Sequence, residues 1–366
     1  MKSRNKTLKT CSRKIEYLIL IHIWMEFNME NYPLVSVVIL NYNGLEYLKE
    51  ILENCLDSVL NTNYPNLEII FVDNGSTDGS ADFVAKYYPS IKILRNKHNL
   101  GFSEGFNRGI KASRGKYIAL LSNDMTVDSN WLNPIISFME ENPKVGLAGF
   151  KRIILGTKNI IDGIGGKLYL CGRIKSIGRL EIDRGQYNTI REDLDYIGGA
   201  MVIRRETLNK AGLFDPNFFI FSEDIDLCYR IRKNGYKIVY IPYSIIYHKG
   251  QATLQRLDSR GLYLEYMANR SRIRCAIIHF TFIRLLSTFL IDLIWLILGN
   301  ALTKKALLKA YWWNLKNISE TLKKRLLYGP SPPYKCKYPI LGFQLSSLKR
   351  RIRQIFHLGN TKLISR

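Results

Sequence analysis

The sequence lacks the patterns that mark two common kinds of site. None of its six cysteines forms a Cys-x-x-Cys pair or stands near a histidine at zinc-like spacing. The thiols are therefore interpreted as buried or incidental, in a reducing compartment. The glycine-rich stretch 99–110 lacks the Gly-x-Gly-x-x-Gly spacing, which leaves a dinucleotide-fold oxidoreductase with little support.

Acidic residues are scarce. The chain has 31 Asp and Glu against 54 Lys and Arg, a formal net charge of +23. This balance predicts an anionic partner, and composition alone leaves open whether it is a nucleic acid, an acidic lipid or a phosphorylated substrate. At 366 residues, 46% of them hydrophobic, the chain is long enough for one large domain with appendages.

Residues 1–32 are interpreted as an N-terminal extension. A basic run precedes the apolar stretch from Ile15 to Trp24, which is too short to span a bilayer. No small-residue cleavage site follows it. We expect an interfacial extension or, if translation starts at Met25 or Met29, a segment absent from the native protein.

From residue 35 onward, buried strands alternate with amphipathic helices. The β-branched run VSVVILNYN predicts a strand buried on both faces, and an apolar stripe from Leu48 to Val59 predicts a helix after it. The alternation continues through LEIIFVD, ADFVAKYY, IKILRN, GFNRGIKAS and KYIALLSND. This order predicts an α/β fold with a mainly parallel central sheet.

Polar residues follow the predicted strands at 41–43, 73–78 and 122–124. Ligands of parallel α/β sheets bind beyond the carboxyl ends of the strands. Asp73 can accept hydrogen bonds from a base or a ribose, and Asp124 is suited to hold Mg²⁺ or Mn²⁺ beside a diphosphate. Each acid alone is also explained as part of a turn or an exposed loop.

Two further signals are weaker. Glycines at 101, 105 and 109 would let a helix lie close to a neighbour, and Asn99 and Asn107 could instead contact a nucleotide. His248 ends a predicted strand pair, YKIVYIPYSIIYH, and is a candidate ligand of a metal or phosphate. A lone histidine is more often structural.

The stretch FSEDIDLCYR, residues 221–230, concentrates acids in this basic chain. Ser222 is a predicted N-cap, and acids in a first helical turn complement the helix dipole. That explains Glu223 and Asp224 structurally. A carboxylate at the margin of the preceding apolar run would also have a raised pKa and serve as a general base. Asp226 is expected to be solvated or to pair with Arg230.

The order of these motifs resembles that of the family 2 glycosyltransferases with the GT-A nucleotide-sugar-binding fold. The resemblance covers residues 35 to about 250 and is greatest to the rhamnosyltransferase-type branch. Its motifs are VSVVILNYNG, IIFVDNGSTDGS, NLGFSEGFNRGI, LLSND, GGAMVIRRETLNKAGLFDPNFF, FSEDIDLCYRIRKNGY and the terminal His248–Gly250.

The resemblance implies an inverting hexosyl- or deoxyhexosyltransferase. It would move a sugar from a nucleoside-diphosphate donor to a hydroxyl of a saccharide or lipid-linked saccharide, in surface polysaccharide or glycan assembly. A single displacement needs no covalent nucleophile, and the chain has no Ser/His/Asp elbow motif. The alternatives are a non-catalytic membrane partner of the same fold and a basic nucleic-acid-binding protein.

The resemblance also implies roles for individual residues. Asp224 would be the catalytic base, and Asp124 and His248 would bind Mg²⁺ or Mn²⁺. Ser122 stands where the family often has a further acid, which puts the affinity for metal in doubt. The nucleotide-sugar would contact Asn41, Asn43, Asp73, Asn74, Asn99, Gly101 and Asn107. The acceptor would contact Gly198, Gly199 and Glu223.

Beyond residue 255 the chain becomes basic and helical. The apolar segment 276–299 is long enough to cross a bilayer, but His279, Arg284 and Asp292 interrupt it. We expect an amphipathic helix pair on an anionic membrane surface, at the inner face of the cell membrane. A helical subdomain packed on the catalytic domain and a single span are the alternatives.

We therefore expect three parts: an extension at 1–32, a GT-A domain at 33–255 and a membrane-associated helical region at 256–366. Nucleic acid is not expected as a partner, because the strand ends carry acids and asparagines. A nucleic-acid-binding face would interleave basic and aromatic residues.

Overall fold

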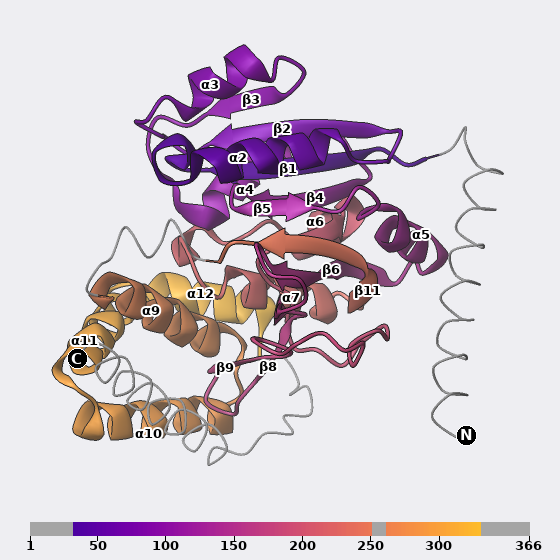
Figure 1. The fold of residues 1–366 in the computed structure, drawn as a ribbon. Helices are drawn as coiled ribbons and strands as arrows, with labels where there is room; N and C mark the ends of the chain where they lie inside the picture. The colour runs from indigo at the N-terminus through magenta and orange to yellow at the C-terminus, as the bar shows by residue number, and fades with distance from the viewer. Residues whose placement is uncertain (1–31, 251–260, 331–366) are drawn as a thin grey trace, which may run out of the picture. The chain divides into compact units, whose positions relative to one another are not determined.

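The computed structural model describes residues 32–250 and 261–330 (Figure 1). The chain divides into two compact units: Met1–Gly165 with Gly178–Ser259, and Gly166–Ile177 with Arg260–Arg366. Nearly all of the expected N-terminal extension lies outside the described residues. The domain boundaries after residues 32 and 255 stay predictions. The sequence did not indicate that Gly166–Ile177 belongs with the C-terminal helices.

The first unit is built on a mixed β-sheet. Its strands β1 to β4 are parallel to one another, in the order β3-β2-β1-β4, and β10, β6, β11 and β5 follow. The bounds are β1 Val35–Asn41, β2 Leu67–Asp73, β3 Lys92–Arg95, β4 Tyr117–Ser122, β5 Met125–Val127, β6 Val145–Ile154, β7 Ile161–Gly163, β10 Met201–Arg204 and β11 Lys237–His248. The parallel pairing predicted for the N-terminal half is present, but β10 runs antiparallel to both β4 and β6.

The predicted strand pair at 236–248 is a single strand, β11. Its pairing with β6 shifts register between Ile241 and Ile245, the segment that contains Pro242. Proline has no N–H to donate to a ladder, so the strand bulges at this point. It does not turn back, and it carries His248 onward to the edge where it meets β5.

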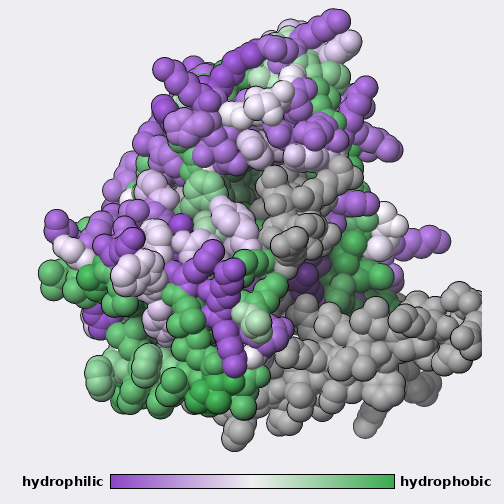
Figure 2. Space-filling model, turned by 90° about the vertical axis from the view of Figure 1, so that its left-hand side faces the viewer, coloured by the Kyte–Doolittle hydropathy of each residue, from purple (hydrophilic) through white to green (hydrophobic). Residues whose placement is uncertain are grey.

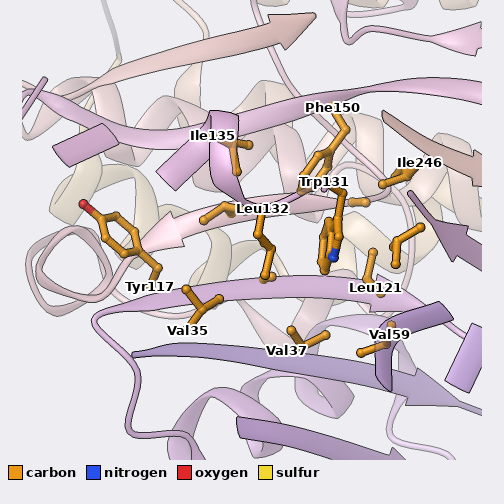
Figure 3. Packing of buried hydrophobic residues seen from close by; sticks show 14 of the residues in the cluster. Val35, Val37, Val59, Tyr117, Leu121, Trp131, Leu132, Ile135, Phe150 and Ile246 are labelled. Atoms are coloured by element: carbon orange, nitrogen blue, oxygen red, sulfur yellow. The ribbon is translucent and has the colours of Figure 1, made fainter. Parts of the chain in front are cut away.

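Helices cover both faces of the sheet. On one face, α2 (Gly44–Leu60) and α5 (Asn133–Glu141) contribute to an apolar cluster with alternate residues of β1, among them Val35 and Val37. Figure 3 shows Trp131, Leu132 and Phe150 packed together in this cluster. Because alternate residues of a strand point to opposite faces, the remaining residues of β1 face the other layer. Among the residues that the structure describes, the other helices of this unit are α3 Ser80–Tyr87, α4 Gly101–Ala112, α6 Arg205–Ala211, the 3₁₀ turn η1 Pro216–Phe218 and α7 Glu223–Lys233.

Helix α4 lies against that other face of β1, and two of its glycines make the close approach possible. A β-carbon at Gly105 would lie 2.7 Å from Leu40 Cδ1, and one at Gly109 would lie 2.2 Å from Val38 Cγ1. The glycine spacing of four therefore serves helix–sheet packing, which was one of the two interpretations left open from the sequence.

The described part of the second unit combines a short hairpin with four helices. The hairpin pairs β8 (Gly166–Leu168) with β9 (Ile174–Ser176). The apolar segment 276–299 is divided between two helices, since α9 ends at His279 and α10 begins at Phe282. Within the described residues, no helix is long and apolar enough to cross a membrane. The helices are α9 Leu262–His279, α10 Phe282–Leu298, α11 Ala301–Lys316 and α12 Ile318–Tyr328.

Candidate active site

The carboxyl ends of β1 and β2 hold a network of buried polar side chains. Asn41 is opposite Asp73 in the sheet, and its amide donates to Asp73 Oδ1 at 3.2 Å. Asn123, just after β4, donates to Asn41 Oδ1 at 2.7 Å. The three strand ends that the sequence singled out therefore meet at one edge of the sheet, as their common direction requires.

The loop after β2 also satisfies the N-terminus of α2. The Asn43 N–H donates to Ser76 Oγ, and Asn43 Oδ1 in turn accepts from the Thr77 N–H, both at 2.9 Å. Asp78 accepts from the Glu46 N–H at 2.9 Å, which supplies one of the four free N–H groups of α2 with an acceptor. The motif DNGSTD thus fixes the geometry of this edge.

Asn74 organises the turn that leads into α4. Its Oδ1 accepts from the Leu100 N–H at 3.1 Å, and its Nδ2 donates to Asn99 Oδ1 and to the Gly101 carbonyl, each at 3.0 Å. Asn99 Oδ1 also accepts from the Gly101 N–H at 2.9 Å. Asn74, Asn99 and Gly101, three of the residues expected at the nucleotide-sugar, therefore lie together.

Asn107 lies apart from this group, with its amide fully engaged. Its Oδ1 accepts from the Phe214 N–H at 3.0 Å and its Nδ2 donates to the Phe214 carbonyl at 2.9 Å. The side chain is 2% exposed. In this structure Asn107 joins α4 to the loop before α7, and its contact with a nucleotide stays a prediction.

The backbone before α7 is strained. Phe219, Phe221 and Ser222 have φ values of 58°, 69° and 62°, a region that side chains larger than glycine seldom adopt. Ser222 occupies the N-cap position, but its side chain makes no capping hydrogen bond, so the predicted cap is wrong in its chemistry. The left-handed backbone turns the chain sharply before the acids. Such strain persists where surrounding contacts over-determine it, commonly at functional sites.

Contacts with α4 hold this strained segment. The Phe219 carbonyl accepts from the Phe102 N–H at 2.6 Å. Gly101 has φ 78°, and a β-carbon there would lie 2.5 Å from the Phe219 ring. The start of α4 and the segment that presents the acids of α7 are therefore in direct contact.

Asp224 is half-buried at the start of α7, while Glu223 beside it is only 6% exposed. Burial raises the pKa of Asp224 to about 6, against the smaller opposing effects of the Ile225 N–H and the Arg152 charge. Burial and the Asp224 charge raise the pKa of Glu223 well above its ordinary value. Asp224 can thus be reached by a partner and gains a proton near neutrality.

The two glycines expected at the acceptor lie beside Asp224. A β-carbon at Gly198 would lie 1.8 Å from Asp224 Oδ2, so no other residue fits there with the carboxylate in place. Gly199 has φ 83°. The Gly198 carbonyl accepts a hydrogen bond from Arg152 Nη1.

Arg152 and Asp162 connect this region to the expected metal ligands, and neither was identified from the sequence. Arg152 Nε donates to Asp162 Oδ2 at 3.1 Å, and His248 Nδ1 lies 3.0 Å from the same oxygen. His248 Nε2 is 3.3 Å from Asp124 Oδ2. Asp162 stands in an Asp-Gly pair, which is typical of a turn, so its local sequence carried no signal.

Charge explains how His248 is held. Burial opposes its protonation, but the hydrogen bonds to Asp124 and Asp162 outweigh burial and raise the pKa of the imidazole to about 9. At neutral pH both ring nitrogens carry hydrogens, one directed at each carboxylate. His248 would have to release a proton before it could bind a metal.

Asp124 has the chemistry of a metal ligand. It is 7% exposed, and its Oδ1 is buried without a hydrogen-bond partner among the residues that the structure describes. An unsatisfied carboxylate oxygen fits a hard divalent cation. No group of three or more His, Cys, Asp and Glu side chains in the described ranges could hold a metal ion. Mg²⁺ commonly takes most of its ligands from water and phosphate.

Asp226 is structural. Its Oδ2 accepts two hydrogen bonds from Arg230, at 2.9 and 2.7 Å, and both side chains are 1% exposed. The predicted i,i+4 pair is therefore confirmed, and it is buried rather than solvated.

Residues 36–212 match the model of a known family, glycosyl transferase family 2. An uncharacterized glycosyltransferase of Haemophilus influenzae is 30% identical over 57% of this chain and 62% of its own length. A poly-beta-1,6-N-acetyl-D-glucosamine synthase of Staphylococcus epidermidis is 27% identical over 57% of this chain and 48% of its own. The chain thus spans about half to three-fifths of these two relatives.

Among solved structures, S. aureus TarS 1–349 in complex with UDP-GlcNAc superposes with a TM-score of 0.51. The match covers 76% of this chain and 79% of that chain at 14% identity, and shows a shared fold. The rhamnosyltransferase-type branch stays a prediction.

Proposed function

Residues 36–212 belong to glycosyl transferase family 2, and the chain has the GT-A fold; from this premise we propose an inverting glycosyltransferase. It moves a hexosyl or deoxyhexosyl group from a nucleoside-diphosphate sugar to a hydroxyl of a saccharide or lipid-linked saccharide. The polysaccharide synthase relative supports a role in glycan assembly.

The placement of Asp224 carries this proposal. Transfer to a hydroxyl needs a base that can accept a proton as the new bond forms. Asp224 is half-buried at the end of a strained segment, its pKa is raised to about 6, and Gly198 leaves room for its carboxylate. At neutral pH it is mostly ionised yet basic enough to take a proton. Glu223, more deeply buried and unable to ionise as easily, would shape the acceptor site.

The donor nucleotide would bind at the carboxyl ends of β1 and β2. There Asp73, which is hydrogen-bonded to Asn41, would accept a hydrogen bond from the base or the ribose. The loop after β2, which Asp73 holds through the Ser76 N–H, would offer backbone N–H groups. Asn41 is fully buried and Asn74 nearly so, which suits them to hold these loops in place.

A divalent cation, Mg²⁺ or Mn²⁺, would be held by Asp124 and, once it has lost a proton, by His248. When bound it would neutralise negative charge on the leaving nucleoside diphosphate. Asp162, itself held by Arg152, orients His248 through a hydrogen bond, as outer partners of ligating histidines do. Ser122 cannot supply a second carboxylate at the end of β4, so the site depends on Asp124.

The enzyme would meet its acceptor at the inner, cytoplasmic face of the cell membrane. Residues 262–328 carry eleven Lys and Arg against three Asp and Glu, an excess that favours binding to anionic lipid. A peripheral enzyme bound in this way would reach a lipid-linked acceptor without a spanning segment of its own.

The test is release of nucleoside diphosphate from a panel of UDP-, GDP- and dTDP-sugars, with lipid extract as acceptor and Mn²⁺ present. Asp224→Asn should lower the rate by about 10²- to 10⁴-fold while donor binding is kept. Asp82→Asn, on the exposed surface of α3, is the matched control and should leave the rate unchanged.

Two outcomes would contradict the proposal. Full activity of the Asp224→Asn variant would remove Asp224 from the role of base. Failure of the wild-type protein to bind any donor would favour a non-catalytic partner of the same fold, the alternative that Ser122 supports.

A further inference from the structure

Helix α10 presents an apolar face to solvent. Phe282, Leu286, Phe289, Leu293 and Ile297 recur at helical spacing and are between 42 and 76% exposed. Figure 2 shows hydrophobic residues gathered along the lower edge of the face that it draws, at the level where Figure 1 places α10. A helix on the surface of a protein in water normally shows the opposite arrangement, with its apolar stripe towards the core.

The inward face of α10 carries polar and charged side chains beside the buried Ile291. Arg284, Thr288 and Asp292, spaced four residues apart, are between 1 and 5% exposed. Asp292 accepts two hydrogen bonds from Arg272 of α9, at 2.8 and 2.7 Å, and one from Tyr311 of α11 at 2.9 Å. The helix is therefore attached to its own unit by charge-assisted hydrogen bonds, together with apolar contacts of Ile291 and Trp295.

This reversed polarity indicates the kind of medium that α10 faces. Exposed apolar side chains are normal when they are scattered, but a contiguous patch marks an interaction site. Here the patch follows one helix, and the helices after it are basic. Lys304, Lys305 and Lys309 lie on α11, and α12 adds three more Lys and Arg.

We propose that α10 lies in the headgroup region of an anionic bilayer, with the face of Phe282, Leu286, Phe289, Leu293 and Ile297 inserted among the acyl chains. The basic residues of α11 and α12 then contact lipid phosphates. This inference rests on the proposed function, because it names the part of the chain that brings the transferase to a lipid-linked acceptor.

The geometry of α10 fits a helix that lies flat. Its 17 residues give a length of roughly 25 Å at 1.5 Å per residue, less than the hydrocarbon thickness of a bilayer. Asp292 and Arg284 both lie on the side away from the exposed face, so insertion of that face leaves both charges in the protein. A spanning helix would instead have to place these charges within the membrane.

The test compares two variants of the full chain by flotation with vesicles. Phe289→Glu with Leu293→Glu puts two charges on the proposed lipid-facing side. Leu180→Glu with Ile182→Glu, at exposed positions of the first unit, makes the same change of charge elsewhere. Vesicles of phosphatidylcholine alone and of phosphatidylcholine with phosphatidylglycerol separate the apolar contribution from the electrostatic one.

We expect the wild type and the control to float with anionic vesicles, and the α10 variant to lose partitioning by about tenfold or more. Flotation of the α10 variant like the wild type would overturn the inference. So would a wild-type protein that self-associates without vesicles and becomes monomeric in the α10 variant, because a second copy would then cover this face.

Donor binding without vesicles separates this inference from the proposed function. The α10 variant should bind nucleotide-sugar as the wild type does. The Asp224→Asn variant should float normally while failing to transfer sugar. Loss of donor binding by the wild type would contradict the proposed function and leave the flotation result to stand by itself.

Discussion

The two units of this chain differ in which side chains they expose to water. In the described part of the first unit, five large hydrophobic side chains are exposed, and buried polar groups gather at the carboxyl edge of the sheet. The described part of the second unit is much shorter but exposes seventeen, while Arg272, Arg274 and Asp292 are buried. Both units bury charged side chains, but the first is organised by a large apolar core, whereas the second turns an apolar face outward.

The difference shows that buried charged groups serve two purposes in this molecule. At Asp224 and Glu223 burial makes ionisation harder, which suits proton transfer. At Asp292 the carboxylate is matched by Arg272 and Tyr311, so its burial holds helices together. Three predictions test this contrast, from the largest expected effect to the smallest.

The first prediction concerns which face of a helix stabilises each unit. Asp292→Ala should lower the free energy of unfolding by about 3–5 kcal/mol, because Arg272 would be left buried without its partner. Phe289→Ala, on the exposed face of the same helix, should change it by less than about 0.5 kcal/mol. Urea denaturation followed by circular dichroism measures both.

A matched pair of alanine substitutions on α2 tests the first unit. There we expect the loss of a buried apolar side chain, rather than of a buried charged one, to be costly. Leu52→Ala removes a fully buried side chain and should cost about 2–5 kcal/mol, whereas Asn54, which is exposed two residues further along, should tolerate alanine. If Phe289→Ala proved as costly as Asp292→Ala, the contrast between the units would fail.

The second prediction uses the raised pKa of Asp224. Its pKa is about 6 in the folded protein and near 3.9 in an unfolded chain. Wild-type stability contributed by this group is therefore fully present below pH 4 and is lost as the pH rises through 6. Asp224→Asn should stabilise the protein by about 1–3 kcal/mol at pH 7 and by much less at pH 4.

The same pKa sets the expected pH dependence of catalysis. The ionised form of Asp224 is the base, so the rate at saturating donor should be half-maximal near pH 6 and level off above about pH 7. If the Asp224→Asn protein is no more stable than the wild type at pH 7, burial of the ionised Asp224 carboxylate does not destabilise the folded protein.

The third prediction concerns Asp162 as a positioning residue. Asp162→Asn keeps its size but removes the charge that orients His248 and Arg152, and should lower activity by about tenfold. The imidazole proton resonances of His248 should shift at the same time. Activity at the wild-type level with unchanged His248 resonances would mean that Asp124 alone orients the ring.

Local sequence patterns predicted much of the first unit. β-Branched runs and apolar stripes have the periods of strands and helices, so β1, α2, β2, α3, β3, α4 and β4 were each expected near their observed positions. Acids and asparagines at strand ends also had to meet at one edge once the strands were parallel. The antiparallel insertion of β10 was not predictable, because pairing direction depends on residues distant in the chain.

The same distinction, between local pattern and pairing of distant segments, separates the predictable from the unpredictable features of the site. Asp73 and Asp124 stood out in the sequence because they follow strands, and Asp224 because it opens a helix, whereas the role of the Gly198–Gly199 pair came only from the family resemblance. Arg152 and Asp162 did not, since only the pairing of β6 with β7 and β11 brings them to His248. The left-handed backbone at Phe219 and Phe221 also has no local signal, because those residue types disfavour it.

The sequence by itself determined which segments form strands and helices, because those periods are local. It also determined that the C-terminal region is apolar and basic at once. Only the tertiary structure decided which face of each helix turns inward. On α10 the hydrogen bonds of Asp292 outweigh the usual burial of leucine and phenylalanine, and the apolar side is left facing outward.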